Sequence, residues 1–220
     1  VPGLPPVLRT METGVVIDTT GSFDSWLESL GRNTRLKAYN RRRYLKERTT
    51  VELQDETDFE RALDHLNALH VGRWGRTCFE GRSLEFHRRM LERLPASARV
   101  QFSELRLGGV TRSVLYDLVI GRRCYNVQAA FDEDYDRKVS LGTLHLGFAM
   151  ERAFEDQDVD AYDLLAGSGK NTQYKKHFRG QEVAFGTYQI IRNPVVRSTF
   201  QTVQHLPDAT RGALRRLARP

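Results

Sequence analysis

The spacing of hydrophobic and polar residues alternates along the chain between the period of a helix and the period of a strand. Residues 49–54 alternate as a strand does, and a helical spacing of apolar residues then continues to Trp74. Thr57 and Glu60 have the spacing of a capping box at the start of that helix. A second helix is predicted over 83–94, so this region has the order strand, helix, helix.

Residues 99–131 have a period of two, which predicts strands. Pairs that contain glycine, at 108–109 and 121–122, have the spacing of tight hairpin turns. We therefore predict a three-stranded antiparallel meander. Its strands are expected at 99–107, 110–120 and 123–131.

Two-residue turns determine which side chains of the meander share a face, because directly opposed residues point the same way. They place Asp117 opposite Asn126, and Leu115 opposite both Gln128 and Phe102. One face then gathers Glu104, Ser113, Asp117, Asn126 and Gln128. Polar groups in the middle of a sheet need a partner or a substrate, so this face is a candidate site. A one-residue bulge would change the assignment.

The segment after the meander predicts a helix between two strands. The helix opens with Ser140, Leu141, Gly142 and Thr143, and its apolar stripe is typical of a helix that packs on a sheet. The first turn offers free backbone N–H groups, and Gly142 lets a ligand approach them, so a phosphate group fits there. The same residues also suit an ordinary strand-to-helix turn. Further strands are predicted at 159–165 and 182–191.

The first 48 residues predict a short strand at 15–19 and two helices. Ser22 and Gly31 mark the ends of the first helix. The second, at about 33–47, lies in a segment with eight basic residues, which fits either phosphate binding or a solvated face. Near the C-terminus, a short helix is expected to begin at Asp208.

Composition limits the class of protein. The 220 residues carry 34 Lys and Arg against 28 Asp and Glu, so the net charge of +6 mildly favours anionic partners. The two cysteines, Cys78 and Cys124, have no metal-binding spacing, so we expect neither a disulfide scaffold nor a metal site. Gly167, Gly169 and Lys170 do not form a phosphate-binding P-loop. No segment is apolar enough for a membrane span, and we expect a cytoplasmic protein.

The order of elements from residue 49 resembles the GNAT acyltransferase fold, an α/β (α+β) fold with a mixed, mostly antiparallel central sheet flanked by helices. The chain is most similar to the BioF2-like or CelD-like branch, which is related to the FemAB aminoacyl transferases. The resemblance covers about residues 22–197. The residues that carry it are His70, Arg73, Trp74, Phe131, Asp132, Tyr135, Ser140–Thr143, Glu151–Ala153, Tyr162–Gly167 and Tyr174–Lys175.

The resemblance implies three segments. Residues 1–48 resemble the end of a preceding GNAT-like half, residues 49–200 form the acyltransferase domain, and residues 201–220 form a helical tail. It also implies that an acyl-coenzyme A donor enters between the strands at 123–131 and 159–165. The residues expected to bind this donor are Val127, Gln128, Ala129, Leu141, Gly142 and Thr143. The usual glycine-rich phosphate loop of the family is reduced here to Gly142.

The implied reaction is attack by an acceptor amine on the acyl carbonyl. Asp117, Glu104 and Asp163 are the candidates for taking the proton of the amine, and Tyr174 is the candidate acid for the leaving group. Lys175 or Arg73 would hold an anionic substrate. Substrate contacts are further expected from Trp74, Asn126 and Glu104.

The sequence therefore predicts an N-acyltransferase that moves an acyl group from acyl-coenzyme A to an amine, without a metal. One alternative is a FemAB-like enzyme that uses aminoacyl-tRNA to modify a cell-wall precursor. Another is a GNAT-like module that binds a partner without catalysis. An acyl-carrier protein is a further candidate donor. The acceptor, the acyl chain and the oligomeric state stay open.

Overall fold

The computed structural model describes residues 5–167 and 174–206. The chain divides into two compact units, residues 13–183 and residues 1–12 with 184–220. The elements in chain order are β1 (Val7–Asp18), α1 (Phe23–Ser29), α2 (Arg32–Arg35), the π-helix η1 (Leu36–Asn40), α3 (Arg41–Lys46), β2 (Val51–Glu56), α4 (Phe59–Trp74), α5 (Gly81–Glu92), β3 (Ala98–Leu107), β4 (Val110–Ile120), β5 (Arg123–Phe131), α6 (Leu141–Glu155), β6 (Ala161–Gly167), β7 (Gln181–Gln189) and α8 (Pro194–Gln204).

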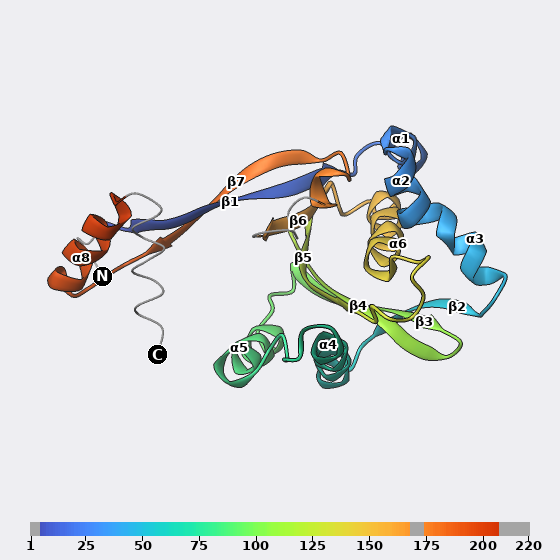
Figure 1. The fold of residues 1–220 in the computed structure, drawn as a ribbon, viewed down its shortest axis with the longest axis horizontal. Coiled ribbons are helices and arrows are strands. Elements are labelled where there is room, and N and C mark those ends of the chain that lie inside the picture. Colours follow the sequence, from blue (N-terminus) through green and yellow to red (C-terminus); the bar gives the residue numbers. More distant parts are fainter. Residues whose placement is uncertain (1–4, 168–173, 207–220) are drawn as a thin grey trace. The chain divides into compact units, whose positions relative to one another are not determined.

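The strands form one mixed sheet in the order β2-β3-β4-β5-β6-β1-β7 (Figure 1). Strands β2 to β5 are antiparallel neighbours, and β1 is antiparallel to β6. Strands β5 and β6 pair in parallel. The expected fold class, a mostly antiparallel mixed sheet flanked by helices, is confirmed.

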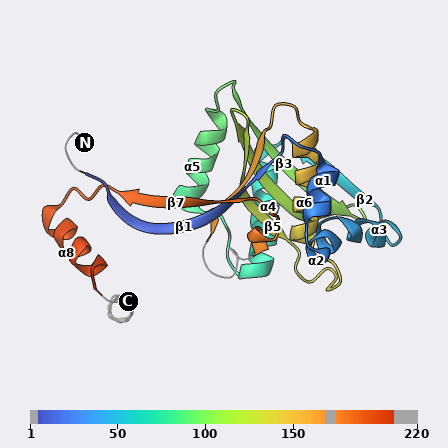
Figure 2. The ribbon, with the colours of Figure 1, turned by 90° about the horizontal axis from the view of Figure 1, so that it is seen from above.

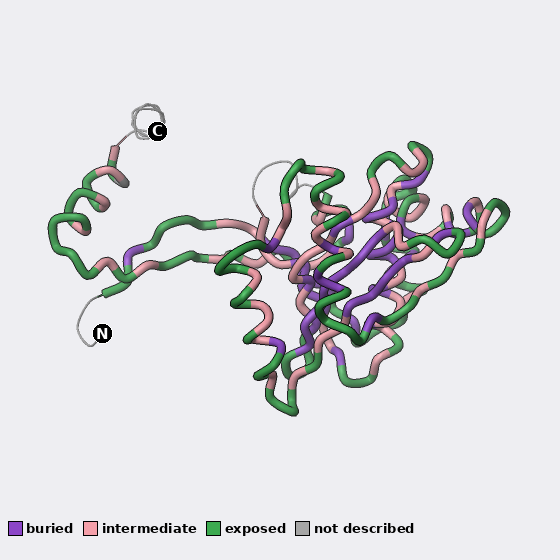
Figure 3. The backbone as a smooth tube through the Cα atoms, turned by 90° about the horizontal axis from the view of Figure 1, so that it is seen from below, coloured by how far each residue is buried: buried purple, intermediate pink, exposed green. Residues whose placement is uncertain are grey.

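Helices cover both faces of the sheet within residues 13–183 (Figures 1 and 2). On one face, α6 packs with α1 and the π-helix over Leu115 and Val119. On the other, α4 and α5 cover Phe102 and Tyr116, whose rings stack. The buried stretches in Figure 3 therefore follow the central strands and the inner faces of these helices.

The limits of the meander agree closely with the prediction, but its register contains two bulges. The shifts leave Arg112 and Val127 without a directly opposed partner in the β3–β4 and β4–β5 registers. Asp117 lies opposite Asn126 as predicted. Leu115 instead lies opposite Ser103 and Ala129.

The bulges also change the predicted polar face. Ser113, Asp117 and Asn126 share the face covered by α6, as expected. Glu104 lies on the opposite face, where its carboxylate contacts His65 Nδ1 at 2.5 Å. Gln128 is opposed to Tyr116 and also leaves the predicted face. One inserted residue reverses every later side chain of a strand, which explains both errors.

The ends of several helices also differ from prediction. The side chain of Asp58 caps α4 by accepting from the amides of Glu60 and Arg61, so the predicted capping box with Thr57 is wrong. The carboxylate of Glu60 instead binds Arg88. The helix expected at 33–47 is interrupted by the π-helix.

Elsewhere the first strand is longer than predicted, because β1 begins at Val7. The predicted helix from Asp208, and the loop positions Gly169 and Lys170, lie outside the described residues. The segment limits expected at residues 48 and 200 remain predictions.

Candidate active site

Strands β5 and β6 pair only at their beginning and then separate. Three residue pairs join them, and the last is Tyr125 with Asp163. Beyond it, β5 keeps its pairing with β4 and β6 keeps its pairing with β1, so the two central strands form an open fork. The bulge at Val127 lies directly after this point and takes that residue out of the regular β4–β5 ladder. Beyond this point the facing edges of β5 and β6 no longer pair with each other.

The fork opens into a cleft of about 680 Å³, a volume typical of small-molecule sites. All of its lining residues lie within residues 13–183. They are Lys37, His70, Arg73, Trp74, Arg76, Asn126–Ala129, Phe131, Ser140, Gly142, Thr143, Leu146, Leu164–Gly167, Tyr174 and Lys175.

The charged groups of the cleft are basic. Lys37, Arg73, Arg76 and Lys175 line it, and none of the described lining residues is acidic. The guanidinium of Arg73 lies 4.4 Å from the ring centre of Phe131 and donates to Glu133 at 3.2 Å, which orients it at the cleft wall. A cleft with this charge favours an anionic ligand.

The start of α6 forms one end of the cleft. Ser140, Gly142 and Thr143 line it, and the first turn of a helix carries backbone N–H groups without partners in the helix. Glycine at 142 has a structural reason as well, because a Cβ there would lie 2.4 Å from the Phe131 ring. Leu141 is buried and does not line the cleft.

Asp117, a predicted proton acceptor, is buried behind the cleft and does not line it. Asn126 Nδ2 donates to its Oδ1 at 2.7 Å, and the Tyr162 hydroxyl donates to its Oδ2 at 2.9 Å. Burial raises the pKa of Asp117 to about 6, although both hydrogen bonds oppose the rise. Asp117 therefore contacts a residue of the cleft wall, Asn126, and itself lines a separate, small cavity of about 30 Å³.

Asp163 also lies outside the cleft lining. Its Oδ1 accepts from the amide of Leu165 at 2.8 Å, and its Oδ2 lies 3.6 Å from Arg123 Nη1. Burial raises its pKa, opposed mainly by the hydrogen bond from Leu165. Leu165 has a positive φ of 55° and lies in β6 where the β1–β6 register shifts, so Asp163 stabilises a strained bulge beside the cleft.

Tyr174 and Lys175 do line the cleft. Burial raises the pKa of Tyr174, and the charge of Arg73 opposes this, so its hydroxyl is protonated at neutral pH. Lys175 Nζ donates to the carbonyls of Leu164 and Leu165 at 2.6 and 3.1 Å, which fixes the ammonium at the edge of β6.

The structure thus brings most of the predicted residues together. Val127, Gln128, Ala129, Gly142, Thr143, Arg73, Trp74, Asn126, Tyr174 and Lys175 line one cleft. Glu104 does not, because it lies on the opposite face of the sheet. Two basic lining residues, Lys37 and Arg76, are not among the predicted ones. The basic segment at 32–48 is evident in the sequence, but its spacing does not show that Lys37 alone reaches the cleft.

Other chemical sites are limited in the described part of the chain. It contains no group of three or more His, Cys, Asp or Glu side chains arranged to hold a metal ion. None of its helices combines the length and apolarity needed to cross a bilayer.

Known structures share this fold at low sequence identity. FemX has a TM-score of 0.56 and 13% identity, over 84% of this chain and 63% of that one. A C-terminal domain assigned to a lysylphosphatidylglycerol synthetase from Agrobacterium fabrum has a TM-score of 0.56 and 12% identity, over 88% of this chain and 63% of that one. L-PGS from Bacillus licheniformis has a TM-score of 0.55 and 11% identity, over 90% of this chain and 66% of that one. The chain spans less than two thirds of each of these three chains.

Sequence comparison leads to a family. No curated protein matched the chain. Residues 32–176 match the family described as "Acetyltransferase (GNAT) domain", and this match includes the fork, α6 and every residue that lines the cleft. The chain therefore belongs to the GNAT acetyltransferase domain family.

Proposed function

We propose that the protein is an N-acyltransferase that moves an acyl group from acyl-coenzyme A to an amine acceptor. The observation that carries this proposal is the β5–β6 fork, which opens into a basic cleft of about 680 Å³. A pantetheine arm contains amides that pair with exposed strand backbone, and the coenzyme's phosphates suit the basic wall. The donor phosphates would lie near the start of α6, within reach of Lys37 and Arg73.

In the proposed reaction, the amine nitrogen attacks the thioester carbonyl carbon. The carbonyl oxygen gains negative charge, which a backbone N–H at the Val127 bulge would stabilise. The C–S bond then breaks, and Tyr174 would give its proton to the leaving sulfur. Because neither Asp117 nor Asp163 lines the cleft, we propose that water takes the proton from the amine nitrogen.

A second candidate donor is aminoacyl-tRNA, and exposed basic side chains in the helical segment around Lys37 favour it. Arg32, Arg43, Lys46 and Arg48 are exposed on the same helical segment as Lys37. Such a surface would bind a phosphate backbone with steep salt dependence. Transfer to a cell-wall precursor amine would use the same fork.

Calorimetric titration with coenzyme A, acetyl-coenzyme A and a long-chain acyl-coenzyme A tests the donor. We expect micromolar binding that weakens roughly tenfold or more in Lys37→Glu, because a charged hydrogen bond becomes a repulsion. Lys46→Glu makes the same charge change on the same helical segment outside the cleft, and it should bind normally. Gly142→Asp is unsuitable because any side chain at 142 meets Phe131.

The outcomes separate the two donors. Absence of heat with every coenzyme A species, in a folded protein, would refute the acyl-coenzyme A proposal. Salt-dependent binding of aminoacyl-tRNA in a gel-shift assay would then support the second candidate. Transfer itself is read as thiol release from acetyl-coenzyme A that depends on an added amine, with the acylated product identified by mass spectrometry.

A further inference from the structure

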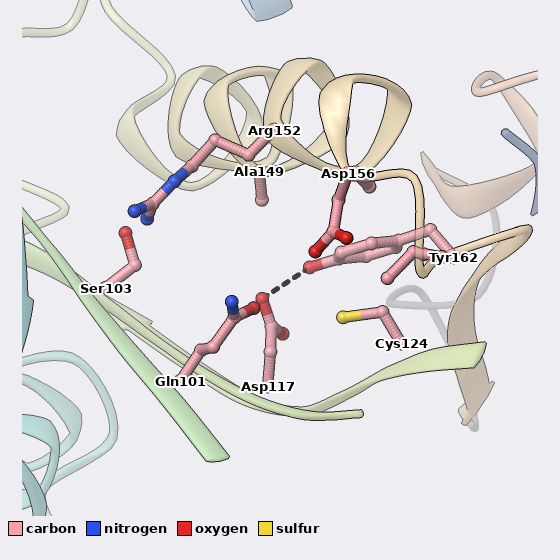
Figure 4. Close-up of a pocket in the computed structure, with 10 residues that line it drawn as sticks. Gln101, Ser103, Asp117, Cys124, Ala149, Arg152, Asp156 and Tyr162 are labelled. Carbon is pink, nitrogen blue, oxygen red and sulfur yellow. Dashed lines mark hydrogen bonds between the residues drawn. The ribbon is translucent and has the colours of Figure 1, made fainter. Parts of the chain in front are cut away.

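A buried polar chain crosses three strands at the closed end of the fork. Tyr162 on β6 donates to Asp117 on β4, and Asn126 on β5 donates to the same carboxylate. Figure 4 shows the Tyr162 hydroxyl directed at Asp117 beneath α6. All three residues are more than nine-tenths buried. Of the three, only Asn126 lines the large cleft.

This arrangement determines which way the Asn126 amide points. An ionised carboxylate only accepts hydrogen bonds, so Asp117 must face the Nδ2 end of the amide. The planar amide then turns its Oδ1 away from Asp117. Within the described part of the chain, no group donates a hydrogen bond to that oxygen. The cleft wall thus holds an oriented acceptor to which none of the described residues donates.

The position of Asn126 relates this acceptor to the reacting end of the donor. Asn126 is the first β5 residue beyond the last β5–β6 pair, and the bulge at Val127 follows it. From Phe131, beside the start of α6, to Asn126, the strand extends about 17 Å at a rise of about 3.3 Å per residue. A donor with its phosphates at α6 and its arm along β5 therefore directs its acyl group towards Asn126.

We propose that the cleft selects acyl groups that carry an N–H or O–H donor near the thioester, and that Asn126 Oδ1 accepts that hydrogen bond. This inference rests on the proposed function and specifies its donor. A plain alkyl acyl group would bury the amide oxygen without a partner. Sites built to bond a polar group discriminate strongly against analogues that lack it, because the unpaired site group costs free energy. Asp117 and Tyr162 act as positioning residues for the amide.

Matched pairs of coenzyme A thioesters test the selection by calorimetry on the full chain. One pair is 3-hydroxybutyryl- and butyryl-coenzyme A, and the other is β-alanyl- and propionyl-coenzyme A. Each pair differs by one donor group, and together the pairs separate a hydroxyl preference from an amine preference. We expect the wild type to bind at least one polar member roughly tenfold more tightly than its alkyl partner.

Two variants connect the preference to the polar chain. Asn126→Leu removes the acceptor and should abolish the difference within each pair. Asp117→Asn keeps the volume but removes the acceptor-only partner, so the amide loses its single orientation and the preference should fall. The readout is the ratio of affinities within each pair, with unacylated coenzyme A as the reference ligand, because damage to the fold would weaken every ligand alike.

Different results would refute the inference and the proposed acyl-coenzyme A donor. Equal affinities within both pairs for the wild type, or a preference that survives in Asn126→Leu, would refute the selection of polar acyl groups. Binding of coenzyme A in the same experiment would still support the proposed donor. If the wild type binds none of these thioesters, the proposed donor is refuted, and the inference is refuted with it.

Discussion

The stability of the protein should depend on pH through His145, which lies fully buried on α6. Its two ring nitrogens contact the hydroxyls of Ser103 and Ser113 at 3.0 and 2.8 Å. Burial, together with the charge of Arg152, lowers its pKa to about 3 from an ordinary value of 6.5. The folded state therefore binds fewer protons than the unfolded state between about pH 3 and pH 6.5.

The sign and size of the effect follow from linkage. Because the unfolded state gains the proton first, the free energy of unfolding falls as the pH drops below 6.5. The slope is about 1.4 kcal/mol per pH unit, which amounts to about 2 kcal/mol between pH 6.5 and 5.0. The loss in this range stays nearly the same for any folded-state pKa well below 5.

Asp117 has the opposite effect and must be separated from His145. Its pKa rises to about 6 from 3.8, so the folded state binds more protons than the unfolded state between these values. Acidification through that range increases the free energy of unfolding and partly hides the effect of His145. The difference between the wild type and His145→Gln cancels the contribution of Asp117, and glutamine can still bond a neighbouring serine.

Urea denaturation followed by circular dichroism at pH 7.5, 6.5, 5.8 and 5.0 measures this difference. We expect the stability of the wild type relative to His145→Gln to fall by about 2 kcal/mol between pH 6.5 and 5.0. The exposed His205 provides the control substitution, His205→Gln. Parallel pH dependence of the wild type and His145→Gln would refute the assignment of a neutral, buried imidazole.

Two further predictions concern packing and thiol chemistry. Gly147→Ala should lower the free energy of unfolding, measured by urea denaturation, by about 1–3 kcal/mol, because the new Cβ would lie 1.9 Å from the Ala38 carbonyl oxygen. The control Gly72→Ala is also in a helix, but its Cβ would have nothing within 4 Å, so it should raise the free energy of unfolding by up to about 1 kcal/mol. Equal effects would contradict the close packing of α6 on the π-helix. Cys78 and Cys124 should resist a disulfide reagent at pH 8 until the protein unfolds, because burial raises the pKa of Cys78 to about 11 and that of Cys124 further. Rapid labelling of the native protein would contradict this prediction. If the two cysteines react slowly, the same reagent can measure the thiol that acetyl-coenzyme A releases.

Local chemistry made the meander predictable. The hairpin glycines Gly108, Gly109 and Gly121 all have positive φ, a conformation that glycine adopts without strain. The turns are therefore evident in the sequence, and the period of two defines the strands between them. The helices on either side follow from their apolar spacing in the same way, although Asp58 replaced the expected cap of α4.

The candidate site was predictable only in part. Gly142 and Thr143 at a helix start, and Arg73 and Trp74 at a helix end, stand out in the sequence, and the structure places them around one cleft. The contribution of Lys37 was not predictable, because it depends on how the π-helix packs against α6.

The sequence by itself determined the order of elements, the turns of the meander and the excess of basic residues, because these depend on neighbours close along the chain. Only the tertiary structure decided the register. The bulge at Val127 places Gln128 off the predicted polar face, and the bulge at Arg112 places Glu104 on the opposite face. The tertiary structure also brings together Asn126, Asp117 and Tyr162, which come from three strands. Burial and hydrogen bonds between distant segments oriented that amide, and no local pattern contains such information.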